Sequence, residues 1–348
     1  MDATKDTRRT ALKVEDLHTY FFNRWGTVKA VDGISFELKE GETLGIVGES
    51  GCGKTMTALS LLRLHPQPAA QIIEGKIVLD GEDILQLPDK EMRNVRGPKI
   101  SMILQDPQTS LNPVYTVGNQ IIETLDRRDD LLKNDLRKEA EESLRKVRVA
   151  APERRLSDFP HQMSGGMKQR VIGAIAMAGG PKVIIADEPT TALDVTIQLQ
   201  YLRLLKELQA ETGMGIIFIT HDFGIVARMC DKVAVMYAGR IVEEGPVREI
   251  FNNPSHPYTE ALIGSVPKME EKTDRLFQID GQPPQLYALP VGCRFTNRCQ
   301  YAKSKCIEAY PSRFSFGENH YASCWRHDES WDKIPSSTKE EITEMLEA

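Results

Sequence analysis

The stretch that decides the fold is Thr43-Leu44-Gly45-Ile46-Val47-Gly48-Glu49-Ser50-Gly51-Cys52-Gly53-Lys54-Thr55. Its first five residues form an apolar run typical of a buried strand, and its last eight match G-x-x-x-x-G-K-[ST]. Glycines in such a loop carry no Cβ, so backbone N–H groups can turn toward phosphates. Apolar positions after the loop predict a helix whose positive N-terminal end faces the same anion. The stretch therefore predicts a site for a nucleoside triphosphate.

We expect most residues of this loop to contact the nucleotide. Lys54 supplies a positive charge for the β- and γ-phosphates, and the Thr55 hydroxyl is placed to bind Mg²⁺. The nucleotide-binding residues predicted here are Gly48, Ser50, Gly51, Cys52, Gly53, Lys54 and Thr55.

Composition limits the class of protein. The 348 residues, with 41% hydrophobic residues, suffice for one large domain and a smaller one. The formal net charge of −6 gives no basic field for nucleic acid. We find no apolar run long enough to span a membrane, and the first residues lack the apolar core of a secretory signal. These features predict a cytosolic location without a nucleic-acid partner.

Hydrophobic patterns predict an α/β fold. Nearly continuous apolar runs at 182–185 and 215–219 indicate parallel strands buried on both faces, with a helix over 195–210 between them that ends near Gly213. Shorter strands are expected at 34–38, 76–81 and 100–104. From 117 to 149 the pattern is helical, with one apolar face formed by Leu132, Leu136, Ala140, Leu144 and Val147.

Two acids follow the strand predicted at 182–185. Asp187 stands where a strand end opens on the nucleotide, and an acid there can hold the Mg²⁺ that bridges the phosphates. Glu188 comes one residue later, and successive strand residues point in different directions. It can therefore face an attacking water and act as a general base.

A second glycine-rich segment lies at His161–Arg170, which reads H-Q-M-S-G-G-M-K-Q-R. Ser164, Gly165 and Gly166 can offer a hydroxyl and open N–H groups at a helix start, which would form a second phosphate cradle. The segment resembles the signature L-S-G-G-Q of ATP-binding-cassette (ABC) ATPases, with Met163 and Met167 in place of Leu and Gln. The chain thus resembles the nucleotide-binding subunit of an ABC transporter.

The resemblance implies roles for further residues. Gln105 matches the glutamine at the Mg²⁺ and water site, Asp194 matches the D-loop at the dimer interface, and His221 matches the switch histidine near the γ-phosphate. Trp25 matches the aromatic residue that stacks on adenine. The implied activity is ATP hydrolysis with Glu188, His221 and Lys54 as the catalytic residues, and Thr55, Gln105 and Asp187 around Mg²⁺. In the family, the Ser-Gly-Gly cradle closes on ATP held by the opposite subunit, so hydrolysis should need a dimer.

Several stretches narrow the resemblance to the ATPases of dipeptide and oligopeptide importers: 106–113, 236–239, 256–259 and 292–295. It implies two membrane permease subunits, a second homologous ATPase or a second copy of this chain, and an extracytoplasmic solute-binding protein. The expected location is then the cytoplasmic face of the cell membrane. Relatives with this architecture also import nickel, glutathione or sugars, so the cargo rests on analogy.

The expected domains are a nucleotide-binding domain over 1–265, with a helical subdomain at about 108–167, and a cysteine-rich C-terminal domain over 266–348. The boundary is placed near 254–267, beyond which Pro and Cys become more frequent. The polar tail 336–348 is expected to form a surface helix.

Four cysteines with the spacing C-x5-C-x6-C-x17-C lie in the C-terminal segment: Cys293, Cys299, Cys306 and Cys324. In a reducing cytosol such a cluster suggests a metal centre, and four thiolates can hold a [4Fe–4S] cluster or Zn²⁺. Structural zinc more often uses a C-x2-4-C knuckle, which is absent here. Some peptide-importer ATPases that this tail resembles carry an iron–sulfur cluster, so we favour the cluster, with zinc as the alternative and unligated thiols third.

Two rival functions remain at this point. One is a soluble ABC ATPase that works on ribosomes or DNA, although such proteins usually carry two cassettes or long coiled-coil insertions. The other is a degenerate cassette that binds ATP and hydrolyses it poorly. The presence of Lys54, Asp187, Glu188 and His221 favours an active ATPase.

Overall fold

The computed structural model describes residues 8–24, 26–128, 130–191, 193–266, 278–336, 338, 341, 342 and 345. By its internal contacts the chain divides into two compact units. Unit 1 comprises Met1–Lys13, Glu37–Thr43 and Lys76–Ile219. Unit 2 comprises Val14–Phe36, Leu44–Gly75 and Thr220–Ala348, so it contains both the glycine loop and the four cysteines.

The core of unit 1 is a parallel sheet. Strand β6 (Ile100–Ile103) pairs with β7 (Val183–Asp187), which pairs with β8 (Gly215–Thr220). Every residue of β7 and β8 is buried, as expected for parallel strands covered on both faces. Helix α8 (Val195–Thr212) precedes β8 and ends at Gly213, whose φ of 72° suits the left-handed cap. The predicted strands and the helix between them are confirmed.

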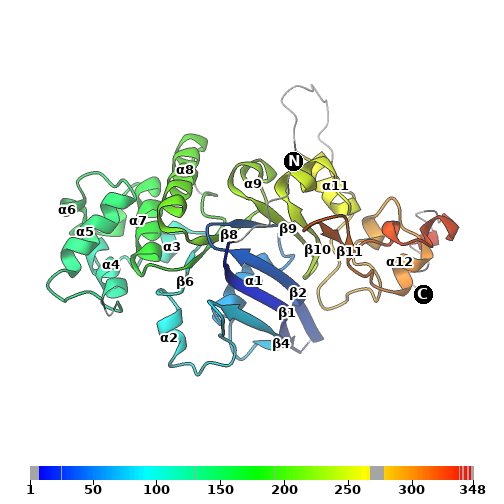
Figure 1. The fold of residues 1–348 in the computed structure, drawn as a ribbon, viewed down its shortest axis with the longest axis horizontal. Coiled ribbons are helices and arrows are strands. Elements are labelled where there is room, and N and C mark those ends of the chain that lie inside the picture. The colour runs from blue at the N-terminus through cyan, green and yellow to red at the C-terminus, as the bar shows by residue number, and fades with distance from the viewer. Residues whose placement is uncertain are drawn as a thin grey trace. The chain divides into compact units, whose positions relative to one another are not determined.

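Three helices of unit 1 lie side by side, namely α4 (Val117–Leu125), α5 (Leu136–Lys146) and α7 (Gly165–Ala178) (Figure 1). The predicted apolar face is buried at Leu136, Ala140, Leu144 and Val147. The prediction for Leu132 is wrong, because this side chain lies in the connection between α4 and α5 and is 73% exposed. Four short helical segments complete the unit: α2 (Met92–Val95), α3 (Pro107–Ser110), α6 (Pro152–Arg155) and η1 (Pro160–Gln162).

In unit 2 the strand before the glycine loop, β3 (Thr43–Val47), runs parallel to β9 (Lys232–Tyr237). Strand β9 continues antiparallel into β10 (Arg240–Pro246). The cysteine-rich segment then adds β12 (Tyr321–Ala322) beside β10 and β11 (Phe314–Ser315) beside β12. Two strands of the described range 278–336 therefore extend the sheet of β9 and β10.

The other elements of unit 2 are mostly short helices. They are α1 (Lys54–Leu61), α9 (Phe223–Met229), α10 (Val247–Asn252), α11 (Pro257–Gly264), η2 (Thr296–Arg298), α12 (Ser304–Glu308), η3 (Trp325–His327) and η4 (Trp331–Lys333). Helix α11 lies inside the range 254–267, where the sequence predicts a domain boundary. The predicted tail helix at 336–348 falls mostly outside the described residues.

A second sheet has the strand order β2-β1-β4-β5, formed by β2 (Gly26–Lys39), β1 (Thr10–Asn23), β4 (Ala70–Leu79) and β5 (Glu82–Asp83). Strands β1, β2 and β4 contribute residues to both units. The strands predicted at 34–38 and 76–81 lie largely within β2 and β4, but β4 ends before Asp80. Asp80 and Gly81 have φ of 53° and 86°, which turns the chain into β5.

A buried ion pair fixes the C-terminal segment within unit 2. Arg294 donates to the Asp32 carboxylate of β2, which also accepts from the Tyr20 hydroxyl and, at 3.2 Å, from Arg240 Nε. Burial alone would raise the pKa of Asp32, but the hydrogen bond from Tyr20 and the charge of Arg294 hold it below its usual range. Asp32 is therefore ionised, and its charge is compensated where it is buried.

Helix α11 has a titratable cap, which gives a testable prediction. The Nδ1 atom of buried His256 accepts a hydrogen bond from Tyr258 N at 3.1 Å, and burial lowers the His256 pKa to about 4 although the Glu243 charge opposes this. Since the unfolded side chain has a pKa of about 6.5, the unfolded state binds more protons below that value. The free energy of unfolding should therefore fall as the pH drops from about 6.5 to 4. Denaturant titrations of His256→Asn, which keeps a cap acceptor, should show a smaller fall, and an equal fall would contradict this prediction.

Candidate functional site

The glycine loop has a backbone that side chains could not follow. Gly48 and Gly53 have φ of 154° and 113°. A Cβ at Gly48 would lie 2.1 Å from the Met236 carbonyl oxygen, and one at Gly53 would lie 2.2 Å from that of Ala30. Strand β3 leads into this loop, and α1 begins at Lys54 directly after it. The predicted strand, loop and helix are confirmed, and they form a close-packed cradle with exposed residues Ser50, Gly51 and Thr55 on its surface.

Lys54 lies across the loop. Its side chain is buried, and Nζ donates to the carbonyl oxygens of Gly48 at 2.8 Å and Glu49 at 3.0 Å. Cys52 is also buried, and burial raises the pKa of its thiol. The Cys52 side chain therefore packs beneath the loop as a small apolar group, while its backbone N–H donates to Glu49 O at 3.3 Å and its carbonyl oxygen accepts from Gly239 N at 2.8 Å.

A cavity of about 370 Å³ opens beside the loop within unit 2. Its lining includes Gly48 and Glu49 from the loop, His221 from the segment before α9, and Arg298 from the cysteine-rich segment. The structure thus brings predicted residues Gly48 and His221 to one cavity. Asp222, the neighbour of His221, caps α9 by accepting from Gly224 N and Ile225 N, which fixes the turn that carries the histidine.

Glu49 and Arg298 form a contact that sequence reasoning missed. The two Nη atoms of Arg298 donate to the two carboxylate oxygens of Glu49 at 2.7 and 2.9 Å. Tyr237 Oη accepts from Arg298 Nη1 at 3.3 Å, and Tyr258 Oη accepts from the backbone N–H of Glu49 at 2.9 Å. The available signals were an acidic residue inside a phosphate loop and an arginine directly before Cys299.

Unit 1 holds the predicted acids. Asp187 is buried at the end of β7, while Glu188 is partly exposed and has a φ of 44°, in the left-handed region. Its backbone N–H donates to Ile219 O at 2.9 Å. Gln105 Nε2 and Thr191 Oγ1 each donate to Glu188 Oε2 at 3.0 Å. The structure therefore brings Gln105 and Glu188 together.

The second cradle in unit 1 faces solvent. Ser164 is the N-cap of α7 and accepts from Met167 N at 3.4 Å, and both Ser164 and Gly165 are exposed. A Cβ at Gly165 would meet no atom within 4 Å, whereas one at Gly166 would lie 3.0 Å from Ile197. Asp194 caps α8 by accepting from two backbone N–H groups. Trp25 lies outside the described residues.

The cysteines are free thiols in a dense environment. Cys306 and Cys324 are buried, and the N–H of Cys293 donates to Cys306 O at 2.7 Å. Burial raises the pKa of all four thiols, to about 11 for Cys293 and about 12 for Cys324, and charges on neighbouring cysteines raise several of them further. Within the part of the chain that the structure describes, no three of the sulfur atoms lie within 4.8 Å of one another.

No helix in the described part of the chain is both long and apolar enough to cross a bilayer.

Residues 31–191 match the family model of the ABC transporter, and residues 242–306 match the model "Oligopeptide/dipeptide transporter, C-terminal region". The chain is 48% identical to the dipeptide transport ATP-binding protein DppD of Bacillus subtilis, over 91% of this chain and 95% of the relative. This chain belongs to the ATP-binding subunits of peptide ABC transporters. The oligopeptide transport ATP-binding protein OppD of the same organism is 49% identical over 90% of this chain and 88% of the relative.

Solved structures confirm the ABC ATPase fold of this subunit. A post-hydrolysis dimer of the cassette MJ0796, bound to ADP and Pi, matches with a TM-score of 0.61 at 28% identity, covering 68% of this chain and 99% of that chain. CbiO1 of Clostridium perfringens, part of the ABC transporter complex cbiONQ, matches with a TM-score of 0.60 at 30% identity, covering 70% and 92%. The predicted P-loop α/β fold is therefore confirmed, whereas the domain boundaries and the roles of single residues stay predictions.

Proposed function

We propose that this ABC ATPase hydrolyses ATP to energise the import of dipeptides or oligopeptides delivered by an extracytoplasmic binding protein. The observation that carries the proposal is the match of residues 242–306 to the C-terminal region of oligopeptide and dipeptide transporters, in addition to the cassette itself. The names of the relatives support the same cargo class.

In the proposed reaction, water attacks the γ-phosphorus and the bond to the β–γ bridging oxygen breaks. Lys54 and backbone N–H groups of the glycine loop bind the triphosphate, and Glu188 takes the proton from the water. Gln105 holds the Glu188 carboxylate through its hydrogen bond, and His221 keeps the γ-phosphate in place. Thr55, Gln105 and Asp187 would hold Mg²⁺, which would neutralise phosphate charge. The Thr55 hydroxyl and the carboxylate of Asp187, the last residue of β7, suit this ion because Mg²⁺ prefers oxygen ligands.

The exposed Ser164 and Gly165, together with the half-buried Gly166, support a nucleotide-sandwich dimer. Their open N–H groups at the start of a long helix suit the phosphates of ATP bound by a second subunit. We propose that this second subunit is a related ATPase or another copy of this chain. The pair would act on two membrane permease subunits at the cytoplasmic face, without nucleic acid.

For the C-terminal segment we propose a [4Fe–4S] cluster bound by Cys293, Cys299, Cys306 and Cys324, with Zn²⁺ as the alternative. Support comes from the gathering of four free thiols in one small segment, in which Cys306 and Cys324 are buried. A tetrahedral zinc ion would be bound by the same four thiolates through Zn–S bonds of ~2.3 Å. A cluster would link distant parts of this segment and stabilise it, because its helices and strands are short and its core is small.

This proposal predicts the metal content of the protein. Anaerobically purified protein should contain iron and acid-labile sulfide at about four of each per chain, with a visible charge-transfer absorption. Cys299→Ser should lose most of the iron, whereas Cys230→Ser, outside the segment, should keep it. Stoichiometric zinc without iron or sulfide would contradict the cluster.

Uptake by cells tests the transport function. A deletion strain of the native host should lose uptake of labelled dipeptide or oligopeptide, and the wild-type gene should restore it while Glu188→Gln should not. Restored uptake of nickel, glutathione or a sugar instead would change the cargo. Glu188→Gln trapped with ATP should co-purify with two multi-span proteins and a related ATPase, and recovery with ribosomes or DNA would overturn the transport function.

A further inference from the structure

The phosphate loop carries an acid where a triphosphate is to bind. The Glu49 side chain is 28% exposed, while its partner Arg298 is only 2% exposed. A free carboxylate at this place would repel the phosphates that the loop and Lys54 attract. The sequence therefore contains an electrostatic conflict inside the loop, and the structure places a buried guanidinium against it.

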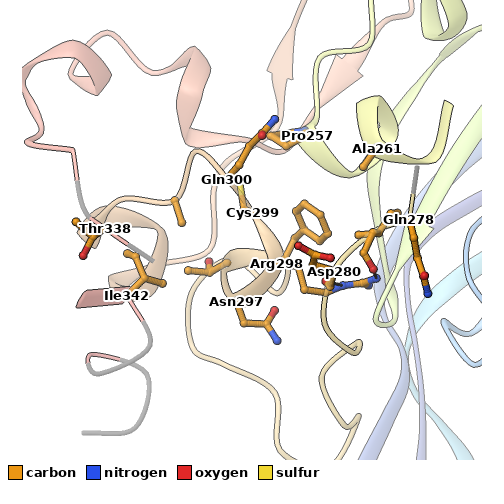
Figure 2. A pocket seen from close by; sticks show the side chains of 14 residues that line it. Pro257, Ala261, Gln278, Asp280, Asn297, Arg298, Cys299, Gln300, Thr338 and Ile342 are labelled. Atoms are coloured by element: carbon orange, nitrogen blue, oxygen red, sulfur yellow. Dashed lines mark hydrogen bonds between the residues drawn. The ribbon is translucent and has the colours of Figure 1, made fainter. Parts of the chain in front are cut away.

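Arg298 is held firmly by its own segment. Its Nε donates to the Asp280 carbonyl oxygen at 3.0 Å, and Figure 2 shows its side chain reaching from the turn before Cys299 toward Asp280. A planar guanidinium with both ends bonded gives a two-point link of fixed direction to the carboxylate. The loop residue Glu49 is thus held at its carboxylate by Arg298 and at its N–H by Tyr258.

We propose that Arg298 is a positioning residue of the ATP site, which neutralises Glu49 and turns its carboxylate away from the phosphates. The cysteine-rich segment thereby forms part of the support of the phosphate loop. The inference rests on ATP binding at this loop, as in the proposed function, and not on which metal the cysteines hold.

The decisive variant is Arg298→Gln. Loss of two charge-assisted hydrogen bonds and exposure of the Glu49 charge should weaken binding of a fluorescent ATP analogue by at least ~10-fold. The matched control is Arg326→Gln, because Arg326 also lies close to a cysteine of the segment but pairs with Glu260 of α11, at 2.8 Å. The control should bind within about twofold of wild type.

Rescue separates positioning from folding. In the Arg298→Gln background, Glu49→Gln removes the unpaired charge. The double variant should therefore recover at least half of the binding free energy that Arg298→Gln loses. A role in stability alone would show as a lower melting temperature without nucleotide, and this rescue would not occur. Arg298→Lys keeps one charge without the two-point geometry and serves if Arg298→Gln does not fold; it should bind more weakly than wild type.

Each outcome decides something different. Wild-type affinity in folded Arg298→Gln or Arg298→Lys, or failure of Glu49→Gln to improve binding, would overturn the positioning role. Equal losses in Arg298→Gln and Arg326→Gln would also overturn it, since the effect would then be general to the segment. Failure of the wild-type protein to bind the analogue would instead overturn the ATP site of the proposed function.

Discussion

Glu188→Gln should bind ATP within about twofold of wild type and hydrolyse it at least ~10²-fold more slowly. The carboxylate is the group proposed to take the proton from water, and an amide of the same shape cannot take it. The hydrogen bond from Gln105 shows that the residue is oriented by its surroundings, so the loss should come from chemistry and not from misplacement. Steady-state phosphate release at saturating ATP measures the rate, and equilibrium binding measures the affinity.

The matched variant for this prediction is Gln105→Ala. It removes one hydrogen bond to Glu188 but leaves the carboxylate, so it should slow hydrolysis by a smaller factor than Glu188→Gln. Normal turnover in Glu188→Gln would remove this residue from the role of base. A variant that loses ATP binding together with turnover would show that Glu188 acts earlier, in forming the site.

Gly53→Ala should lower the free energy of unfolding by roughly 2–6 kcal/mol and abolish detectable ATP binding. A residue other than glycine is strained at a φ of 113°, and the added Cβ would lie 2.2 Å from Ala30 O, a backbone atom that cannot move alone. The loop must therefore shift, and with it the N–H groups at the start of α1. Urea denaturation and nucleotide titration measure the two effects.

Gly165→Ala is the control for Gly53→Ala. It also adds a Cβ to a glycine that opens a helix of this ATPase, but no atom lies within 4 Å of the added group. Its free energy of unfolding should change by less than ~1 kcal/mol. Equal destabilisation by both changes would contradict the steric argument for the phosphate loop.

The parts of the fold that were predicted from sequence are those fixed by local pattern. The strand, loop and helix around Lys54, the two buried strands β7 and β8, and the end of α8 at Gly213 each depend on residues close together in the chain. Leu132 was misplaced because helical spacing continued by chance across the connection between α4 and α5.

The support of the loop could not be read from the sequence. Glu49 and Arg298 are 249 residues apart, and neither local periodicity nor a motif links them. The pairing of β12 with β10 could not be predicted either, because a strand of two residues is too short to show an alternating pattern that would fix its register. Helix α11 lies within the range 254–267 and β12 beyond it pairs with β10, and the domain boundary in this range stays a prediction.

The left-handed backbone at Glu188 has a consequence for directed evolution. Glutamate is rarely found at a φ of 44°, where glycine or asparagine is more at ease. A library at this position screened only for heat resistance should thus enrich glycine and asparagine. Such a screen would select subunits that are more heat-stable but no longer hydrolyse ATP at the rate transport needs. Stabilised variants of this protein should therefore be selected for ATP turnover as well as for heat resistance.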